Sequence, residues 1–391
     1  MPAKIERDKF FWTIALQTLV INFFLGGFGP AQPLLRADQG TSLTIAGLHG
    51  TAMGVASIFA GFANPWLSHK FGRLNAGWIG FYIFMVGLVA ISFLQPVPLT
   101  ILAAGIAGFG VSTVINSSVT SLNNRYKAMA PIAVGQANGV ASVGYVLGTF
   151  TIGNIAQQAP DFWRLGLLLI LPAALYLAFF YREKSDEPHV PHVDGPQSGK
   201  LSPAFWIAWF GFIATISTEF ATAFWAAALV RDRTDASAAI STIAIMALGT
   251  GMGLGRFFGG RVMHKLSLDH QLLAILGLQL LSFVGIWLSH NLAISIVMLL
   301  LNGIGISMQF ALTSLRLISH SDGRPDLAIG KSSLGAGIAI GGAPFLLGVF
   351  GDSFGISRAY LMVPVLILIA AAVVIAVPAH MSKEELNRLE A

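Results

Sequence analysis

Cysteine is absent from this 391-residue sequence, and charged residues are scarce. The first absence excludes disulfides and thiolate metal sites. The second is more informative, because charged residues are 10% of the chain, against about 25% in a soluble domain. Hydrophobic residues make up 55%, and the mean hydropathy is +0.72. So few charges cannot cover a surface that faces water, so most of this surface must face lipid.

Several chemical motifs are also missing. No basic run with interleaved aromatic residues indicates nucleic acid binding, and no phosphate-binding Gly-x-x-x-x-Gly-Lys indicates an ATP-driven pump. No His-x-x-x-His and no paired carboxylates within the apolar segments point to a metal or catalytic site. A membrane-embedded enzyme would have to use His49, His69 and His264, which lie far apart in the sequence. His189 and His192 stand alone in a polar stretch. The sequence therefore predicts no enzyme, no cofactor and no metal site.

Long apolar stretches are what the sequence has in abundance. About 20 apolar residues are needed to cross the hydrocarbon of a bilayer. The first stretch is too long for a signal-peptide core, so we expect it to be retained as a membrane helix. The predicted spans are 10–34, 43–67, 75–94, 98–120, 132–156, 162–181, 204–229, 237–261, 270–289, 292–315, 327–350 and 357–378.

Basic residues alternate in density between the segments that connect these spans. If the N-terminus is cytoplasmic, the outer segments hold few basic residues, while the inner segments and both termini hold most of the lysines and arginines. By the positive-inside rule, both termini are cytoplasmic. We predict a protein of the plasma (inner) membrane, in contact with its lipids. The basic residues of the outer segments are Arg36, Arg164, Arg231, Arg233 and Arg358.

The two halves of the chain resemble one another. At an offset of 195 residues, Gly108 to Ser112 (GFGVS) falls on Gly303 to Ser307 (GIGIS). At the same offset, His69 and Lys70 fall on His264 and Lys265. This repeat predicts an all-α protein of two pseudo-symmetric six-helix bundles with a cavity between them. The predicted parts are an N-terminal half over 1–181, a cytoplasmic linker over 182–203, a C-terminal half over 204–378 and a cytoplasmic tail over 379–391.

These features together resemble the major facilitator superfamily, over essentially the whole chain. The basic turn after the second span, Lys70 to Arg73, is similar to the end of the family's Gly-x-x-x-Asp-Arg/Lys-x-Gly-Arg motif. Gly255 to Arg261 (GRFFGGR) is similar to its counterpart in the bacterial fucose-permease-like and efflux groups. The resemblance implies twelve membrane helices and transport of a small solute by alternating access, usually by a monomer.

The motif is also altered, because Pro65 replaces the family's glycine and His69 its aspartate. The arginine that proton-driven drug antiporters carry in the fourth span is missing, since no charged residue occurs between Pro98 and Asn124. We predict an inner gate that opens when His69 and His264 are protonated. The alternative is that both are solvated loop residues. The predicted gate residues are His69, Lys70, Arg73, Arg256, His264 and Lys265, with Arg256 and Arg261 expected to meet lipid phosphates or loop carbonyls.

One acidic residue, Glu219, lies deep inside a predicted span. A charge at the bilayer centre costs at least about 2.5–3.5 kcal/mol and normally faces a wet cavity. Glu219 is therefore predicted to bind a proton or the substrate, although a structural hydrogen bond is an alternative. With no cation at the same depth, an obligatory dianion is not expected as the substrate.

Further polar residues recur at helical spacing in the first, fourth, fifth, seventh and tenth spans. We expect these stripes to line the central cavity, although Asn and Gln also bond between packed helices. The predicted function is proton-coupled secondary transport of a small organic solute. Efflux of amphipathic compounds is the alternative, and a non-transporting sensor is a weaker one. Beside Glu219, the predicted binding residues are Asn22, Asn116, Asn138, Tyr145, Thr222, Trp225, Asn302 and Gln309.

Overall fold

The computed structural model describes residues 7–126, 130–182, 199–263 and 265–379. Within these residues, twelve helical segments are long and apolar enough to cross a membrane. The prediction of an integral multi-pass membrane protein is confirmed. The first five spans are α1 (Lys9–Phe28), α3 (Leu43–Phe71), α4 (Arg73–Phe93), α5 (Val97–Tyr126) and α6 (Ala130–Gln158). The sixth is built from η2 (Pro160–Phe162), α7 (Trp163–Gly166), η3 (Leu167–Ile170) and α8 (Leu171–Phe180).

The second six spans follow the same order. They are α9 (Pro203–Thr234), α10 (Ala238–Ala244) with α11 (Met246–Val262), α12 (Leu268–Leu288), α13 (Leu292–Ile306) with α14 (Gln309–Ser319), α15 (Pro325–Phe354), and α16 (Ile356–Ala359) with α17 (Met362–Ala376). Most of the predicted linker, and the tail from residue 380, lie outside the described residues.

The predicted end of the first span at residue 34 is wrong. Helix α1 ends at Phe28, and a separate short helix, α2 (Gln32–Gln39), follows. Pro30 lies in the break and has no backbone N–H to continue the helical hydrogen bonds. Pro33 then occupies the first turn of α2, where its missing N–H costs nothing. The hydropathy of the segment extends through both helices, so composition alone did not reveal the break.

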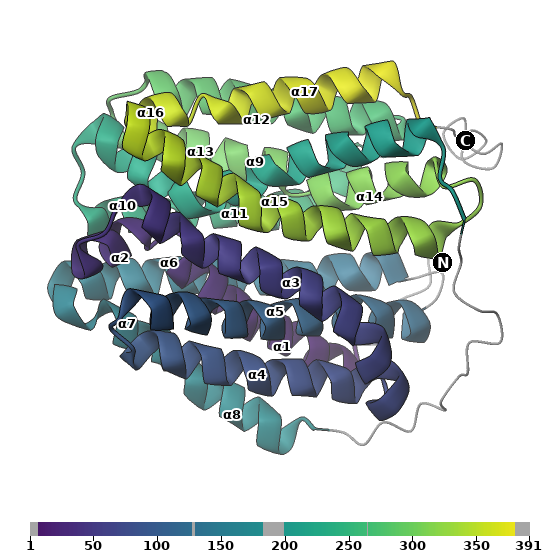
Figure 1. Cartoon of the computed structure of the whole chain (residues 1–391), viewed down its shortest axis with the longest axis horizontal. Helices are drawn as coiled ribbons and strands as arrows, with labels where there is room; N and C mark the ends of the chain where they lie inside the picture. Colours follow the sequence, from purple (N-terminus) through teal and green to yellow (C-terminus); the bar gives the residue numbers. More distant parts are fainter. Residues whose placement is uncertain (1–6, 127–129, 183–198, 264, 380–391) are drawn as a thin grey trace.

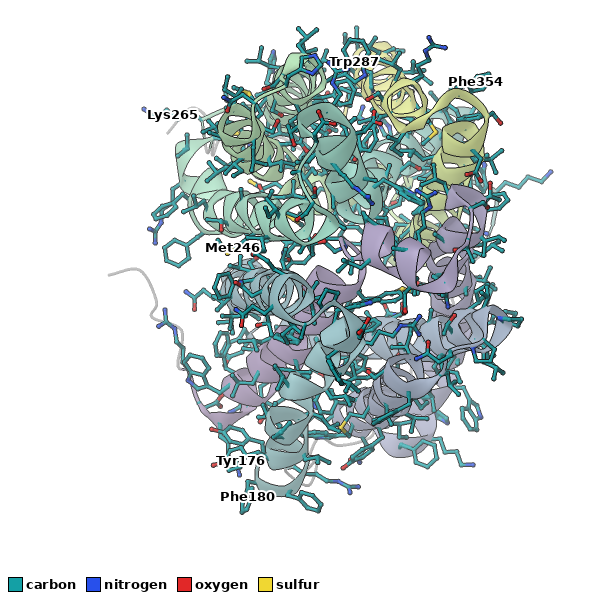
Figure 2. All side chains as sticks on the ribbon, turned by 90° about the vertical axis from the view of Figure 1, so that its left-hand side faces the viewer. Tyr176, Phe180, Met246, Lys265, Trp287 and Phe354 are labelled. Atoms are coloured by element: carbon teal, nitrogen blue, oxygen red, sulfur yellow. The ribbon has the colours of Figure 1, made fainter. Side chains whose placement is uncertain are left out.

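The helices form two groups that lie against each other (Figure 1). Helices α1 and α3 to α8 make the N-terminal half, and α9 to α17 make the C-terminal half. The start of α1 and the end of α17 lie at one end of the molecule, which we call the terminal end (Figure 1). The short helices α2, α10 and α16 lie at the opposite end, which we call the far end (Figure 1). Seen from the far end, Tyr176 and Phe180 stand at the outer edge of the N-terminal half (Figure 2).

Two helix pairs join the halves: α3 packs on α15, and α6 packs on α10 and α11. We call these the α3–α15 seam and the α6–α11 seam. The α3–α15 seam is tight towards the far end, because glycines bring the backbones together. A Cβ added at Gly54 would clash with the backbone nitrogen of Gly341, and one at Gly348 would lie 2.6 Å from the Leu43 carbonyl oxygen.

Both seams loosen towards the terminal end. A Cβ added at Gly61 would meet its nearest neighbour, Ser333, at 3.9 Å, and one at Gly139 would meet Phe257 at 4.0 Å. Among the described residues, nothing lies within 4 Å of a Cβ added at Gly135 or Gly330. The two halves are therefore closed together at the far end and separate at the terminal end.

Matching sequences in the two halves build matching local structures. The Asp8 carboxylate accepts a hydrogen bond from the Phe11 N–H (3.0 Å), and the Ser202 hydroxyl accepts one from the Phe205 N–H (3.2 Å). Each is an N-cap that satisfies a free N–H of the first turn. The first and seventh spans therefore start with the same geometry at the terminal end.

Candidate functional site

Glu219 lies midway along α9, on the side that faces the N-terminal half. Its side chain is half-buried, and its carboxylate has no hydrogen-bond partner among the described residues. It interacts electrostatically with the guanidinium of Arg256 on α11 and with the hydroxyl of Tyr145 on α6. A half-buried carboxylate with opposite charge nearby and no fixed partner is able to gain and lose a proton.

Arg256 does not occupy the place that we predicted for it. Instead of meeting lipid phosphates or loop carbonyls, its Nη1 donates a hydrogen bond to the Ser142 hydroxyl of α6 (3.2 Å). The side chain is half-buried and interacts electrostatically with Glu219 and Tyr145. Gly249 precedes Arg256 by two turns of α11, and Gly253 precedes it by one turn. All three residues therefore lie on the helix face that packs on α6. A cation therefore shares the site with Glu219, against expectation.

Tyr145 and Ser142 bring α6 to this charge pair. The Tyr145 ring packs on α11 so closely that a Cβ added at Gly249 would lie 2.5 Å from it. Its hydroxyl is buried and has no hydrogen-bond partner among the residues that the structure describes. Ser142 accepts from Arg256 and donates to the Asn138 carbonyl oxygen (3.0 Å). The site is thus formed by both halves, with the charges on one half and their hydroxyl neighbours on the other.

A cavity of about 610 Å³ lies beside the charge pair, between α1, α6 and α11. We call it the side cavity. Ser142 and Gly253, which lie next to Arg256, form part of its wall, and Arg7 and Gln136 lie among its lining residues. Most of the other lining side chains are apolar, and several of them are also exposed on the outer surface of α6 and α11. The apolar lining residues include Val140, Val143, Val146, Leu147, Leu254, Phe257 and Phe258.

Three asparagines that were predicted to bind the solute have side chains that are partly or fully exposed. Asn22 on α1 is half-buried and donates to the Thr18 carbonyl oxygen (2.8 Å) of its own helix. Asn116 on α5 is half-buried, and Asn138 on α6 is exposed one turn before Ser142. These residues remain candidates for contact with a solute.

Thr222 bonds within α9, and Trp225 joins α9 to α15. The Thr222 hydroxyl donates to the Thr218 carbonyl oxygen (2.7 Å). Trp225 is fully buried, and its indole N–H donates to the carbonyl oxygen of Pro344 in α15 (2.9 Å). That carbonyl lies next to Gly47 of α3, whose added Cβ would be 2.9 Å away. Trp225 therefore supports the α3–α15 seam and does not face open space in this conformation.

Asn302 and Gln309 do not line the cavity in this conformation. They belong to a buried network between α9, α12, α13 and α14, centred on Gln279. Gln309 donates to the Gln279 side chain (2.7 Å), and Asn302 donates to the Ser282 hydroxyl (3.0 Å). Gln279 in turn donates to the Thr218 hydroxyl (3.0 Å). Their spacing in the tenth span reflects bonding between packed helices, the alternative that the sequence left open.

Of the predicted gate residues that the structure describes, all except Arg256 lie at the terminal end. His69, Lys70 and Lys265 are exposed, and the Lys70 ammonium lies 5.0 Å from the Trp66 ring. Arg73 opens α4 directly after Gly72, whose φ of +84° favours glycine at this turn. His264 lies outside the described residues, so the pairing of His69 with His264 stays a prediction.

A comparison of sequences identifies the family to which this fold belongs. The model of the Major Facilitator Superfamily matches residues 14–322 of this chain. The chain belongs to the major facilitator superfamily. It is a transporter and not an enzyme. No curated protein matches the chain significantly in sequence.

Solved structures of this superfamily share the fold. The xylose transporter XylE from E. coli, in a partially occluded inward-open conformation, has a TM-score of 0.76 and 14% identity, covering 96% of this chain and 98% of that one. A bacterial homologue of the human lysosomal transporter Spinster, inward-facing and occupied, has a TM-score of 0.73 and 14% identity, covering 96% and 97%. A variant of the nucleoside transporter NupG has a TM-score of 0.73 and 11% identity, covering 95% and 99%.

Proposed function

We propose that this superfamily member moves a small organic solute across the plasma (inner) membrane by proton-coupled alternating access, as a monomer. The observation that carries the proposal is the charge pair of Glu219 and Arg256. Both side chains are half-buried where the two halves meet, and the Glu219 carboxylate has no fixed partner among the described residues. A proton binds here at a place that is exposed to different sides as the halves move.

Alternating access is supported by the unequal packing of the two ends. The far end is closed by glycine contacts along the α3–α15 seam, while both seams loosen towards the terminal end. The bias of lysine and arginine towards the terminal end supports a cytoplasmic position for that end. With this orientation, the structure is open towards the cytoplasm, and rocking of the halves opens the site to the outside.

Glu219 is the proposed proton carrier. Arg256 remains charged throughout, because guanidinium does not release its proton in proteins. Protonation of Glu219 therefore changes the net charge of the pair from neutral to positive. A change of charge at a half-buried site alters the free energy of enclosing that site. Proton binding is thereby coupled to the movement of the halves.

The proposal is tested with Glu219→Gln in proteoliposomes, after a thermal-shift screen has identified a solute that stabilises the protein. Wild type is expected to accumulate this solute when a proton gradient is imposed. Glu219→Gln is expected to lose accumulation but to keep counterflow of labelled solute, because exchange requires only movement of the loaded site. Asp235→Asn is the matched control: it removes a carboxylate at the end of the same helix, where Asn also accepts the left-handed φ of 54°. Normal accumulation by Glu219→Gln would refute the role of this residue.

Efflux of amphipathic compounds is a second candidate, and the apolar lining of the side cavity favours it. The same proteoliposomes separate the two functions. In symport, a solute gradient moves protons in the direction of the solute. In antiport, it moves them in the opposite direction, and the sign of the pH change inside the vesicles decides between the two.

A further inference from the structure

The two seams differ at the positions that the sequence repeat makes equivalent. At the offset of 195 residues, Arg256 corresponds to Gly61 and Ser142 to Gly337. The α3–α15 seam thus has glycine at both positions, and a Cβ added at Gly337 would clash with Ile58. The α6–α11 seam has a charged hydrogen bond there, with the side cavity next to it. Within the described residues, an arginine and an adjacent cavity occur together in the α6–α11 seam but not at the equivalent positions of the α3–α15 seam.

The cavity lining limits the chemistry of a ligand. Polar side chains in the wall are few: they are Ser142, Thr250, Gln136 and Arg7, and Arg7 donates a hydrogen bond to the Gln136 side chain (3.1 Å). A sugar-like solute would bury several hydroxyls against valine, leucine and phenylalanine, and each unpaired hydroxyl would cost free energy. An apolar body fits these walls without that cost, and the volume of about 610 Å³ lies within the usual range of small-molecule sites.

We propose that the transported solute is an amphiphilic organic monoanion, with its carboxylate-like group on Arg256 and its apolar body in the side cavity. This inference rests on the proposed function and names the solute class of the same site. The anion replaces the Ser142 hydroxyl as the partner of the guanidinium, which gains a charge-assisted hydrogen bond. The apolar body leaves water for walls that already face the apolar part of the membrane.

Glu219 and the anion compete for the charge of Arg256. The charged or titratable groups that interact with Arg256 are Glu219 and Tyr145. The Tyr360 hydroxyl instead donates a hydrogen bond to the carbonyl oxygen of Ala221 in α9. Protonated Glu219 leaves the guanidinium without a compensating carboxylate. Anion binding and protonation of Glu219 therefore favour each other, as linkage requires. One proton and one monoanion together leave the site with the same charge as the empty pair.

The test measures binding of labelled decanoate, with decanol as its uncharged match, to the full-length protein in nanodiscs of zwitterionic lipid. Empty nanodiscs supply the background. Decanoate is expected to bind and to be accompanied by proton uptake, while decanol binds about tenfold or more weakly. Arg256→Gln is expected to remove this difference. Arg261→Gln removes an arginine five residues further along α11 that does not line the cavity, and it is expected to leave the difference intact.

Several outcomes would overturn the inference. They are equal binding of decanoate and decanol by wild type, unchanged decanoate binding by Arg256→Gln, and equal losses in Arg256→Gln and Arg261→Gln. Displacement of decanoate by an added anionic phospholipid would assign the site to a lipid headgroup instead. The wild-type comparison needs no variant, so it stands even if Arg256→Gln does not fold.

Val143→Trp, which fills the side cavity without changing a charge, is expected to weaken decanoate binding as well.

The inference and the proposed function fail in different ways. If decanoate does not bind while another solute is accumulated with protons, the solute class is wrong and proton-coupled transport stands. If decanoate binds through Arg256 but no proton gradient drives its accumulation, the site assignment stands and the coupling is wrong.

Discussion

The Asp352 carboxylate, at the end of α15, caps the first turn of α3, which begins at Leu43. Its two oxygens accept hydrogen bonds from the Leu43 N–H (2.8 Å) and the Thr44 N–H (2.7 Å). The cap therefore joins the two halves at the far end, where a residue of one half satisfies the free N–H groups of a helix in the other. The negative charge also interacts favourably with the helix N-terminus. This contact has to break when the far end opens.

We expect Asp352→Asn to favour the state that is open at the far end. Loss of an N-cap interaction costs about 1 kcal/mol, which shifts the equilibrium roughly fivefold. Because the protein has no cysteine, spin labels are introduced at two sites only, Ala37 and Ser353, which are exposed on opposite halves. Their distance distribution is expected to gain a longer component. Asp161→Asn, in η2 at the far end of the N-terminal half, is the control, and an unchanged distribution in Asp352→Asn would refute the role of the cap.

Gly54→Ala is expected to disturb the same closed state through packing. Its new Cβ would clash with the Gly341 backbone, and overpacking of this kind costs about 1–3 kcal/mol. We expect lower thermal stability and a shift of the spin-label distances towards the open far end. Gly342→Ala is a matched control from the facing helix, since nothing lies within 4 Å of a Cβ added there among the described residues. Equal stability of the two variants would show that the seam does not need its glycine.

Gln309→Leu is expected to lower stability without changing solute affinity. It removes the donor to the Gln279 side chain and leaves part of a buried network unpaired, which costs about 1–3 kcal/mol. Thermal unfolding and solute binding are measured on the same preparation, with Gln271→Leu at the terminal end of α12 as the control. A large loss of solute affinity at unchanged stability would place Gln309 in the transport site after all.

Two ion pairs at the terminal end are expected to differ in strength. Arg316 is buried and bonds to Asp269 at 2.7 Å, whereas Arg324 bonds at 3.3 Å to Asp322, whose side chain is 61% exposed. Breaking a buried pair costs about 3–5 kcal/mol, and an exposed pair contributes about 0–1 kcal/mol. Arg316→Gln should therefore lower the unfolding temperature strongly and Arg324→Gln only slightly. The two shifts, measured side by side in one lipid, are expected to differ clearly, and similar shifts would contradict this assignment.

The sequence by itself determined the class of the protein, the number of spans and the family. These properties depend on composition, on stretches of apolar residues and on a repeat, all of which are local or periodic and can be read without knowing contacts. Glu219 was also chosen as a candidate in this way, because a single carboxylate within an apolar span is visible in the sequence.

Tertiary structure alone decided which polar residues meet. Asn302 and Gln309 have the same spacing as cavity-lining residues, but their partner Gln279 lies on another helix, so only packing reveals the network. The sequence places Arg256 near the inner end of its span, but the helix face that it shares with Gly249 and Gly253 brings it against Ser142. Helix rotation and tilt are set by side chains of neighbouring helices, which no single span encodes. For this reason the charge pair of the site is visible only in the folded protein.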